Sequence, residues 1–432
     1  MAIVGAGGKT STLRRLAESL GGKVVITTST HMGMDQIETA DKKIFLRDTE
    51  ELLDVEWGNE ERICSITSPP IDGHRLSGLT EDQLSKLYEL SVRRGFSILI
   101  EADGAKMLPL KAPAEHEPVI PEWVDAVVVV AGMSALGKHL NAETVFRPEL
   151  FGSLACMAQD EIITGDRLAK ALSDPCGSLK NIPPKARRIL CLNQAENLKM
   201  HPEIMRVANY CKEFYDQIII CSLGYPRVTP EIYARIEKTA AIILAAGGST
   251  RMNGVAKPLV EFGGVTLLGR AILTAKQSEL SPVIVVVGYQ SDRVTKTIPD
   301  NNVEIVVNDG WEKGQSTSIK AGLRKLADRS GAAIFMLVDQ PFVSAALIER
   351  LRNFHMTTMT HIVAPIVDDI RSNPVLFDRV TFGKLLGLEG DTGGRAIMGH
   401  FSHQWIPWLD KRLLMDIDTP EDLVRCMNES SK

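Results

Sequence analysis

Residues 241–252 read AIILAAGGSTRM, an unbroken apolar run followed by a Gly-Gly turn and a basic residue. A short run that is apolar throughout, rather than at alternate positions, predicts a strand buried on both faces, as in a parallel sheet covered by helices. Similar runs alternate with helical patterns along the whole chain, so we predict an α/β fold. The runs cover residues 2–4, 24–27, 98–100, 126–130, 189–192, 218–220, 241–244, 283–287, 303–307 and 334–338.

The same order of strand, glycine-rich turn and helix occurs at residues 2–11, which read AIVGAGGKTS. The alternation restarts near residue 240, after a Pro-containing stretch in which we predict a helix over 231–238. At roughly 150 residues per domain, a length of 432 residues allows two or three domains. We therefore predict two domains: residues 1–237 with a P-loop-like parallel sheet, and residues 238–432 with a Rossmann-like sheet.

The composition excludes several classes of protein. With 44% hydrophobic and 24% charged residues, the chain is neither disordered nor fibrous. The 49 basic and 54 acidic side chains give a net charge of −5, which argues against nucleic acid or an anionic membrane as a partner. The longest apolar stretch, 126–133, is far shorter than the roughly 20 residues of a membrane span. Seven cysteines without a Cys-x-x-Cys pair indicate reduced thiols, so we expect a cytoplasmic protein.

The turn after residues 241–244 has the features of a phosphate-binding loop. Glycines let the backbone approach a triphosphate, exposed amides bind anions, and cationic side chains supply countercharge. A plain turn would explain the glycines alone, but Arg251 and Lys257 follow on a chain without a general basic excess. The candidate nucleotide-binding residues are Leu244, Ala245, Ala246, Gly247, Gly248, Ser249, Arg251 and Lys257.

Two acidic positions suit a metal ion. Asp339 follows the run 334–338, and open α/β sheets bind their ligands at the carboxyl ends of strands. Its carboxylate suits Mg²⁺ bridging nucleotide phosphates, and the alternative is a helix cap or loop aspartate. In the acidic segment 416–422, a Thr-Pro pair begins a predicted helix and explains the last two acids as capping residues. That leaves Asp416 and Asp418 available for metal.

Six motifs of the C-terminal half occur in the order found in molybdenum cofactor cytidylyltransferases, which this half resembles. These enzymes have the glycosyltransferase-A-like fold of nucleotidyltransferases. In that family, the Leu-Ala-Ala-Gly form of the first loop goes with CTP. The motifs are residues 244–252 with Lys257, the segment from Asn308 to Ser318, residues 339–341, Arg371 with 373–375, residues 390–395 and residues 418–420.

The resemblance implies transfer of CMP from CTP to Mo-molybdopterin, with release of pyrophosphate. Such a transfer needs positioning and neutralisation of charge rather than a protein nucleophile. Asn253 and Ser372 depart from the family pattern, and another phosphorylated acceptor, such as a sugar or polyol phosphate, is the alternative. The implied residues are Arg251, Lys257 and Asp339 in catalysis, Asp339 and Asp418 at Mg²⁺, Gly314 and Ser316 at phosphate, and Arg371, Asn373 and Asp391 at the acceptor.

The first glycine turn has the form Gly-x-x-Gly-Lys-Thr between a strand and a helix, shorter than the usual phosphate loop. We expect Gly5, Gly8, Lys9 and Thr10 to bind ATP or GTP, with Thr10 at a metal ion; a turn without ligand is the alternative. Asp103, near the end of another strand, is a second candidate metal ligand. Residues 193–196, NQAE, look like a degraded guanine-reading motif, although loop chemistry explains them equally well.

Motifs spread over residues 2–235 resemble the accessory proteins of selenium-dependent molybdenum hydroxylases. They include the glycine turn, residues 27–31, 101–106 with 109–111, 116–118 and 147–149. His31 and His116 could bind metal, but two histidines without a third ligand more often serve structure. The resemblance implies a fused protein of cofactor maturation that contacts a molybdenum hydroxylase. A binding module that uses nucleotide only as a switch is the alternative from another functional class.

Overall fold

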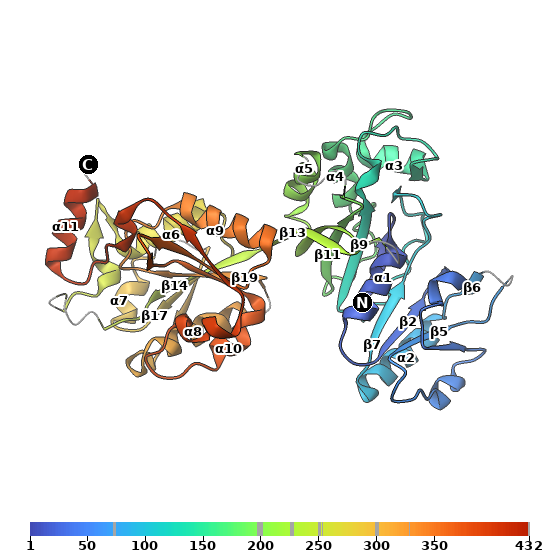
Figure 1. Cartoon of the computed structure of the whole chain (residues 1–432), viewed down its shortest axis with the longest axis horizontal. Helices are drawn as coiled ribbons and strands as arrows, with labels where there is room; N and C mark the ends of the chain where they lie inside the picture. The colour runs from blue at the N-terminus through green and yellow to red at the C-terminus, as the bar shows by residue number, and fades with distance from the viewer. Residues whose placement is uncertain are drawn as a thin grey trace. The chain divides into compact units, whose positions relative to one another are not determined.

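The computed structural model describes residues 1–71, 75–196, 202–224, 229–248, 252, 254–298, 302–327 and 329–430. The chain divides into two compact units, Met1–Ile236 and Glu237–Lys432, and each has a central sheet flanked by helices (Figure 1). All ten predicted runs form strands, so the predicted α/β class is confirmed. Within the described ranges, no helix combines the length and apolarity that crossing a bilayer requires.

The described part of the N-terminal unit contains a nine-stranded sheet in the order β13-β12-β11-β9-β1-β7-β2-β5-β4. The pairings from β12 to β4 are parallel. The strands are β1 (Ala2–Gly5), β2 (Val24–Thr28), β4 (Lys42–Phe45), β5 (Ile63–Thr67), β7 (Ser97–Glu101), β9 (Ala126–Gly132), β11 (Arg187–Asn193), β12 (Gln217–Ser222) and β13 (Glu231–Glu237). The helices are α1 (Lys9–Ser19), α2 (Glu81–Arg94), α3 (Pro148–Ala155), α4 (Gly165–Ser173) and α5 (Pro202–Cys211).

Two strand pairs lie outside this sheet: β3 (His31–Gly33) with β6 (Arg75–Ser77), and β8 (Leu110–Lys111) with β10 (Val145–Phe146). In the sheet itself, β1 lies between β7 and β9, and α1 buries Leu13 and Ala17 against the sheet core. The chain leaves β1 for β2 on one side, whereas β7 leads to β9 on the other side. A crevice at such a reversal is where open α/β sheets bind ligands.

Residues 231–238 were predicted as a helix, and that prediction is wrong, because they form strand β13 next to β12. Ile232 and Ile236 are four residues apart, which places them on one face of a helix but equally on one face of a strand. The enrichment in Ile and Tyr favours the strand, and Ala234 between them is fully buried.

The described part of the C-terminal unit contains an eight-stranded sheet in the order β18-β17-β14-β19-β22-β20-β21, with β23 on the other side of β20. β14 is parallel to β17 and β19, whereas β22 is antiparallel to β19. One face of the sheet packs on α6 and α9, and the other packs on α8 and α10. The carboxyl ends of β14 and β19 are therefore adjacent at one edge, between two helical layers.

The strands of this unit are β14 (Thr239–Ala245), β15 (Glu261–Phe262), β16 (Val265–Thr266), β17 (Val283–Val287), β18 (Val303–Val307), β19 (Ala332–Leu337), β20 (Ile362–Val367), β21 (Ile370–Arg371), β22 (Val375–Asp378) and β23 (His403–Pro407). The helices are α6 (Leu267–Gln277), α7 (Ser291–Thr295), α8 (Gln315–Leu326), α9 (Ala345–Thr358), α10 (Phe382–Leu386) and α11 (Pro420–Ser430).

Candidate functional site

A cleft of about 930 Å³ opens at the carboxyl edge of β14 and β19. Its walls come from the glycine turn, from the segments that follow β18 and β19, and from two loops near the end of the chain. The residues used below are Leu244, Ala245, Ala246, Gly247, Gly248, Lys257, Trp311, Lys313, Gly314, Gln315, Asp339, Asp391 and Asp418. Ser249 and Arg251, both predicted at the nucleotide, lie outside the described residues.

Lys257 contacts two carboxylates in the cleft. Its Nζ donates to Asp339 Oδ2 at 3.1 Å and also to Asp418 Oδ1. Burial lowers the pKa of Lys257, but the two carboxylates outweigh burial and raise it, so the ammonium stays charged. Within the described ranges, the buried Oδ1 of Asp339 has no hydrogen-bond partner. The cluster therefore holds two anionic groups and one cation, with a spare oxygen on Asp339.

Backbone contacts hold the two carboxylate segments in place. The amide of Ile417 donates to the carbonyl of Asp339 at 2.9 Å. The amides of Asp418 and Thr419 donate to Asp422 Oδ2 at 3.3 and 3.0 Å, and the Asp422 amide donates back to Thr419 Oγ1. The capping interpretation of the acidic segment is thus confirmed for Asp422.

Asp416 is the third acid beside the cluster, and it has a partner of its own. Gln340 Nε2 donates to Asp416 Oδ1 at 2.9 Å. Burial raises the pKa of Asp416, and the nearby charges of Asp339 and Asp418 add to the rise. Asp416 thus extends the acidic character of the cluster behind Asp339, held by a neutral amide.

The turn before α8 builds the opposite wall of the cleft. Asn308 Nδ2 donates to the hydroxyls of Thr317 and Ser318 at 2.8 and 2.9 Å. Gly314 has a φ of +106°, and a Cβ there would lie 2.5 Å from Asp391 Cα. The amide of Gln315 donates to Asp391 Oδ1 at 3.2 Å. The backbone of the turn therefore packs against the backbone of the Asp391 loop, and the Asp391 carboxylate accepts a hydrogen bond from the turn.

Of three residues predicted at phosphate or acceptor, two contact other residues, and neither acceptor residue lines the cleft. Ser316 is 1% exposed, and its Oγ donates to the carbonyl of Gly390 at 2.7 Å, so it fixes the Asp391 loop from behind. Among the described residues that line the cleft, neither Arg371 nor Asn373 appears. The Arg371 guanidinium lies 4.6 Å from the centroid of the Trp405 ring. Trp311 does line the cleft, and it packs edge-on against Tyr289 with the ring centroids 5.7 Å apart.

The backbone amides of the first glycine turn donate to acceptors within the protein. The amides of Gly5, Ala6 and Gly7 donate to Asp103 Oδ2, the Val130 carbonyl and the Leu108 carbonyl at 3.0, 2.8 and 3.0 Å. A phosphate at this turn would therefore have to bind further along, at the start of α1, where the first helical amides lack intrahelical acceptors. The phosphate-loop function of Gly5, Gly8, Lys9 and Thr10 stays a prediction.

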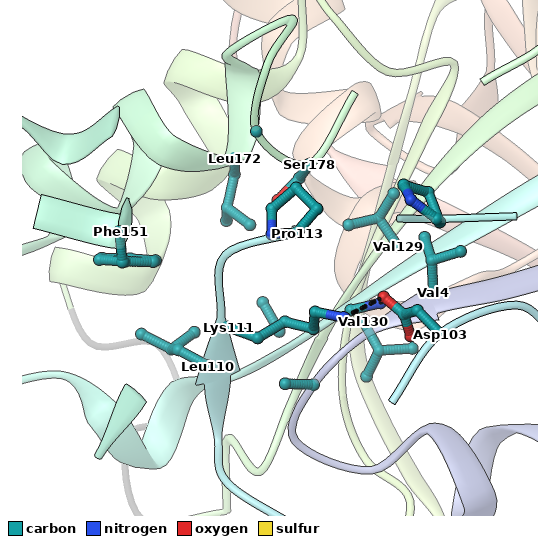
Figure 2. Close-up of a pocket in the computed structure, with 15 residues that line it drawn as sticks. Val4, Asp103, Leu110, Lys111, Pro113, Val129, Val130, Phe151, Leu172 and Ser178 are labelled. Atoms are coloured by element: carbon teal, nitrogen blue, oxygen red, sulfur yellow. Dashed lines mark hydrogen bonds and ion pairs between the residues drawn. The ribbon is translucent and has the colours of Figure 1, made fainter. Parts of the chain in front are cut away.

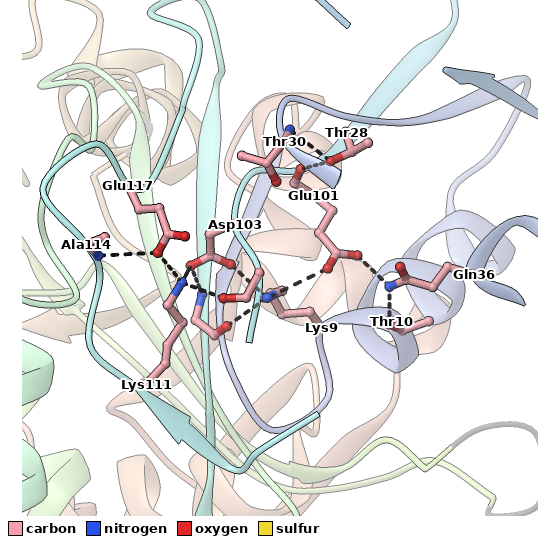
Figure 3. A network of polar contacts seen from close by, with 12 residues as sticks. Lys9, Thr10, Thr28, Thr30, Gln36, Glu101, Asp103, Lys111, Ala114 and Glu117 are labelled. Atoms are coloured by element: carbon pink, nitrogen blue, oxygen red, sulfur yellow. Dashed lines mark hydrogen bonds and ion pairs between the residues drawn. The ribbon is translucent and has the colours of Figure 1, made fainter. Parts of the chain in front are cut away.

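Lys9 belongs to a row of alternating charges, which we call the charge ladder: Glu101, Lys9, Asp103, Lys111, Glu117 and Arg147. The first five members are buried, and Figure 3 shows them. Lys9 Nζ is 2.8 Å from Asp103 Oδ1 and 3.7 Å from Glu101 Oε1. Lys111 Nζ is 2.8 Å from both Asp103 Oδ2 and Glu117 Oε2. Arg147 Nη1 closes the row at 2.7 Å from Glu117 Oε2.

The environment of the ladder shifts the pKa of its end carboxylates in opposite directions. Burial raises the pKa of Glu101 despite Lys9 beside it. Burial acts in the same sense on Glu117, but hydrogen bonds from Arg147 and Lys111 outweigh it and lower the pKa of Glu117 to about 2. The sequence analysis assigned no role to Lys111, Glu117 or Arg147; their only sequence signal was membership in the family motifs.

Gln36 links the candidate metal ligand Thr10 to Glu101. Gln36 Nε2 contacts Thr10 Oγ1 at 2.5 Å and Glu101 Oε2 at 2.8 Å (Figure 3). Asp103, the predicted partner of Thr10, instead bridges Lys9 and Lys111. His31 and His116 are both exposed. Within the described residues, no group of three or more His, Cys, Asp or Glu side chains could hold a metal ion.

A cavity of about 20 Å³ lies beside Asp103 and Lys111. Figure 2 shows apolar side chains around it, among them Val4, Leu110 and Val129, with the Lys111–Asp103 pair at one side. A volume of this size holds about one water molecule.

The segment 193–196 stabilises the fold, since Asn193 Nδ2 donates to the Gly7 carbonyl at 2.8 Å and Gln194 Oε1 accepts from Ser134 Oγ at 2.6 Å.

Comparison with known proteins identifies both units. Residues 1–149 match the sequence profile described as YqeC protein. The uncharacterized protein YqeC of Escherichia coli (strain K12) is 34% identical over 215 residues, which are 48% of this chain and 81% of that protein. This chain belongs to the YqeC family. In this YqeC-family chain, residues 241–405 match the profile of the MobA-like NTP transferase domain, and the C-terminal unit is a nucleotidyltransferase.

Other proteins are similar to part of this YqeC-family chain. The bifunctional protein GlmU of Lactococcus lactis subsp. lactis (strain IL1403) is 29% identical over 141 residues, or 32% of this chain and 30% of GlmU. The chain thus spans less than a third of that relative. The crystal structure of Rv0371c from Mycobacterium tuberculosis H37Rv is 26% identical and covers 44% of this chain and 97% of its own, with a TM-score of 0.40.

Proposed function

We propose that the C-terminal unit transfers CMP from CTP to Mo-molybdopterin with the help of Mg²⁺. An oxygen of the terminal phosphate of the pterin attacks the α-phosphorus of CTP, and the bond from that phosphorus to the bridging oxygen of pyrophosphate breaks. The products are molybdopterin cytosine dinucleotide and pyrophosphate. The observation that carries the proposal is the cluster of Lys257, Asp339 and Asp418 in the cleft beside the glycine turn.

The side chains present fit a divalent cation. Asp339 and Asp418 offer carboxylate oxygens, the ligands that Mg²⁺ prefers, and Asp339 Oδ1 is buried without a hydrogen-bond partner among the described residues. When bound, Mg²⁺ supplies positive charge to the phosphate oxygens. The protein contributes Lys257, which we assign to the triphosphate, and the backbone of residues 244–248, which forms one wall of the cleft. We propose the same triphosphate role for Arg251.

The nucleotide and the acceptor are proposed from the family resemblance and the walls of the cleft. The Leu-Ala-Ala-Gly form of residues 244–247 supports CTP. Asp391 lines the cleft together with Gly314, so we place the acceptor along this wall. Arg371 and Asn373 are proposed as further acceptor contacts, outside the lining of the cleft.

The test uses the purified full chain with CTP, GTP or ATP and with Mo-molybdopterin or a sugar or polyol phosphate as acceptor. Product mass identifies the nucleotide and the acceptor, and pyrophosphate release gives the rate. Asp339→Ala should lower the rate on the order of 10² to 10³-fold, because one preorganised charge contact is lost. Asp410→Ala, which removes a half-exposed acid paired with Arg412, is the matched control and should keep full rate. No transfer with any pair of substrates would refute the proposal.

For the N-terminal unit we propose binding of ATP or GTP at Gly5 to Thr10 and contact with a molybdenum hydroxylase, so that this chain is a fused protein of cofactor maturation. Support comes from the position of α1 directly after β1 and Gly8, since helix N-termini bind phosphate. Titration calorimetry with each nucleotide tests the binding. Thr10→Ala should weaken it at least tenfold, and equal affinity would remove Thr10 from the site.

A further inference from the structure

Lys257 contacts the same two carboxylates that the proposed reaction assigns to a divalent cation. We infer that the Lys257 ammonium occupies the cation position between Asp339 and Asp418 in the nucleotide-free protein, and that a nucleoside triphosphate moves it onto the phosphates and frees the position for metal. This inference rests on the proposed function, because it gives the metal and the nucleotide one common site. It assigns Lys257 a second role, as the group that makes metal binding depend on nucleotide.

Backbone contacts that do not involve the lysine hold the two acidic segments in place. Asp339 and Asp418 are held together by the hydrogen bond from the Ile417 amide to the Asp339 carbonyl. Asp418 is held in addition through its amide, which donates to Asp422 Oδ2. Removal of the ammonium would therefore leave both acidic segments in place, with two carboxylates near the position that the ammonium occupied. Their oxygens are hard ligands suited to Mg²⁺ or Mn²⁺, and Asp339 Oδ1 has no hydrogen-bond partner in the part of the chain that the structure describes.

The lysine and a divalent cation exclude each other. An ammonium 3.1 Å from Asp339 Oδ2 fills the space that a metal ion on that oxygen would need. Two like charges only a few Å apart also repel strongly in a partly buried site. The cation bound first must leave, and the Lys257 side chain can do so because its four-carbon stem is flexible and lines the open cleft.

A triphosphate provides the place to which the ammonium moves. The glycine turn and Lys257 line the same cleft, so phosphate oxygens bound along the turn would compete with the carboxylates for the ammonium. Each transfer of the ammonium uncovers the carboxylates for a dication that also binds the phosphates. Nucleotide and metal therefore bind with positive coupling, typically 5- to 150-fold in affinity.

The test measures Mn²⁺ binding to the full chain without nucleotide, by the electron paramagnetic resonance signal of free Mn²⁺. Lys257→Met keeps the length of the side chain and removes its charge, so it should bind Mn²⁺ at least tenfold more tightly than the unmodified chain. Lys313→Met removes one charge from the same cleft and controls for a general field effect; it should change Mn²⁺ affinity by less than twofold. Lys257→Met with Asp339→Asn should lose the gain.

Lys257→Gln provides a second variant, with a polar side chain in place of the thioether, if Lys257→Met fails to fold. The inference would be overturned if the Lys257 variant bound Mn²⁺ no more tightly than the unmodified chain. It would also be overturned if Lys313→Met raised the Mn²⁺ affinity by the same factor. The proposed function is read separately, from product mass. Transfer without gain of Mn²⁺ binding in the Lys257 variants overturns only the inference, whereas tight Mn²⁺ binding without transfer overturns only the proposed reaction.

Discussion

Lys111→Met should destabilise the N-terminal unit by about 3 kcal/mol. Lys111 is 8% exposed, and it holds Asp103 and Glu117 at 2.8 Å each while donating to the Gly104 carbonyl at 2.7 Å. Breaking a buried ion pair by removal of one partner costs about 3–5 kcal/mol, because a buried charge is left uncompensated. Here Asp103 keeps Lys9 and Glu117 keeps Arg147, so the lower end of that range applies. Methionine fills most of the volume of the lysine stem, which keeps the cavity contribution small.

Hydrogen exchange measured by mass spectrometry on the full chain localises the effect. A loss of about 3 kcal/mol should accelerate exchange of the most protected amides of β9 about 10²-fold, because 1.36 kcal/mol corresponds to a factor of ten. Arg93→Met is the matched control, since Arg93 pairs with Glu89 at 3.4 Å on the exposed face of α2. Such a surface pair contributes about 0–1 kcal/mol.

A double variant tests the reasoning itself. Asp103→Asn together with Lys111→Met restores equal numbers of acids and bases in the charge ladder. The loss of unfolding free energy in the double variant should therefore be about 1–3 kcal/mol smaller than the sum of the two single losses. Additive costs, or a loss below about 1 kcal/mol for Lys111→Met alone, would refute the view that the ladder is stabilised by mutual neutralisation.

Three further predictions concern pH and two glycines. The Glu117 pKa is about 2 in the fold against an ordinary 4.5, so its contribution to stability is complete above pH 4.5 and is lost as the pH falls towards 2; the urea midpoint of Glu117→Gln should vary less with pH in that window. Gly314→Ala should lower kcat/KM of transfer at least tenfold, because φ is +106° and the new Cβ would displace Asp391, whereas Gly310→Ala should be tolerated. Gly8→Ala should cost about 1–3 kcal/mol of unfolding free energy, since φ is +124° and the Cβ would meet Asn193 Nδ2 at 2.2 Å, and unchanged denaturation would contradict this.

Local sequence patterns predicted ten strands correctly, because buried parallel strands are apolar throughout. They missed other strands of the two sheets, among them β4, β5, β20, β22 and β23. The segment 231–238 failed because a four-residue repeat fits one face of either a helix or a strand. At the candidate site, the sequence indicated Lys257 and Asp339 separately, one for phosphate and one for metal. Their direct contact joins residues 82 positions apart, and it depends on the packing of the fold, in which β14 lies beside β19.

Side-chain partnerships in the N-terminal unit were not predictable for the same reason. Gln36 carries no sequence signal of function, yet it joins Thr10 to Glu101. Asp103 was chosen as a metal ligand from its place near a strand end, but two lysines from different segments already contact it. Ionic partners are fixed by tertiary contacts over long sequence separations, and one sequence does not contain that information.

The alternating order of the charge ladder also constrains how this protein can change over time. Replacement of one interior member by a neutral residue leaves two like charges as neighbours, with little solvent to screen them. Replacement of an adjacent acid and base together by neutral side chains keeps every remaining charge beside an opposite one. Among relatives, Asp103 and Lys111 should therefore vary jointly or stay as they are, and an ancestor that lost one of them would have been under selection to lose the other.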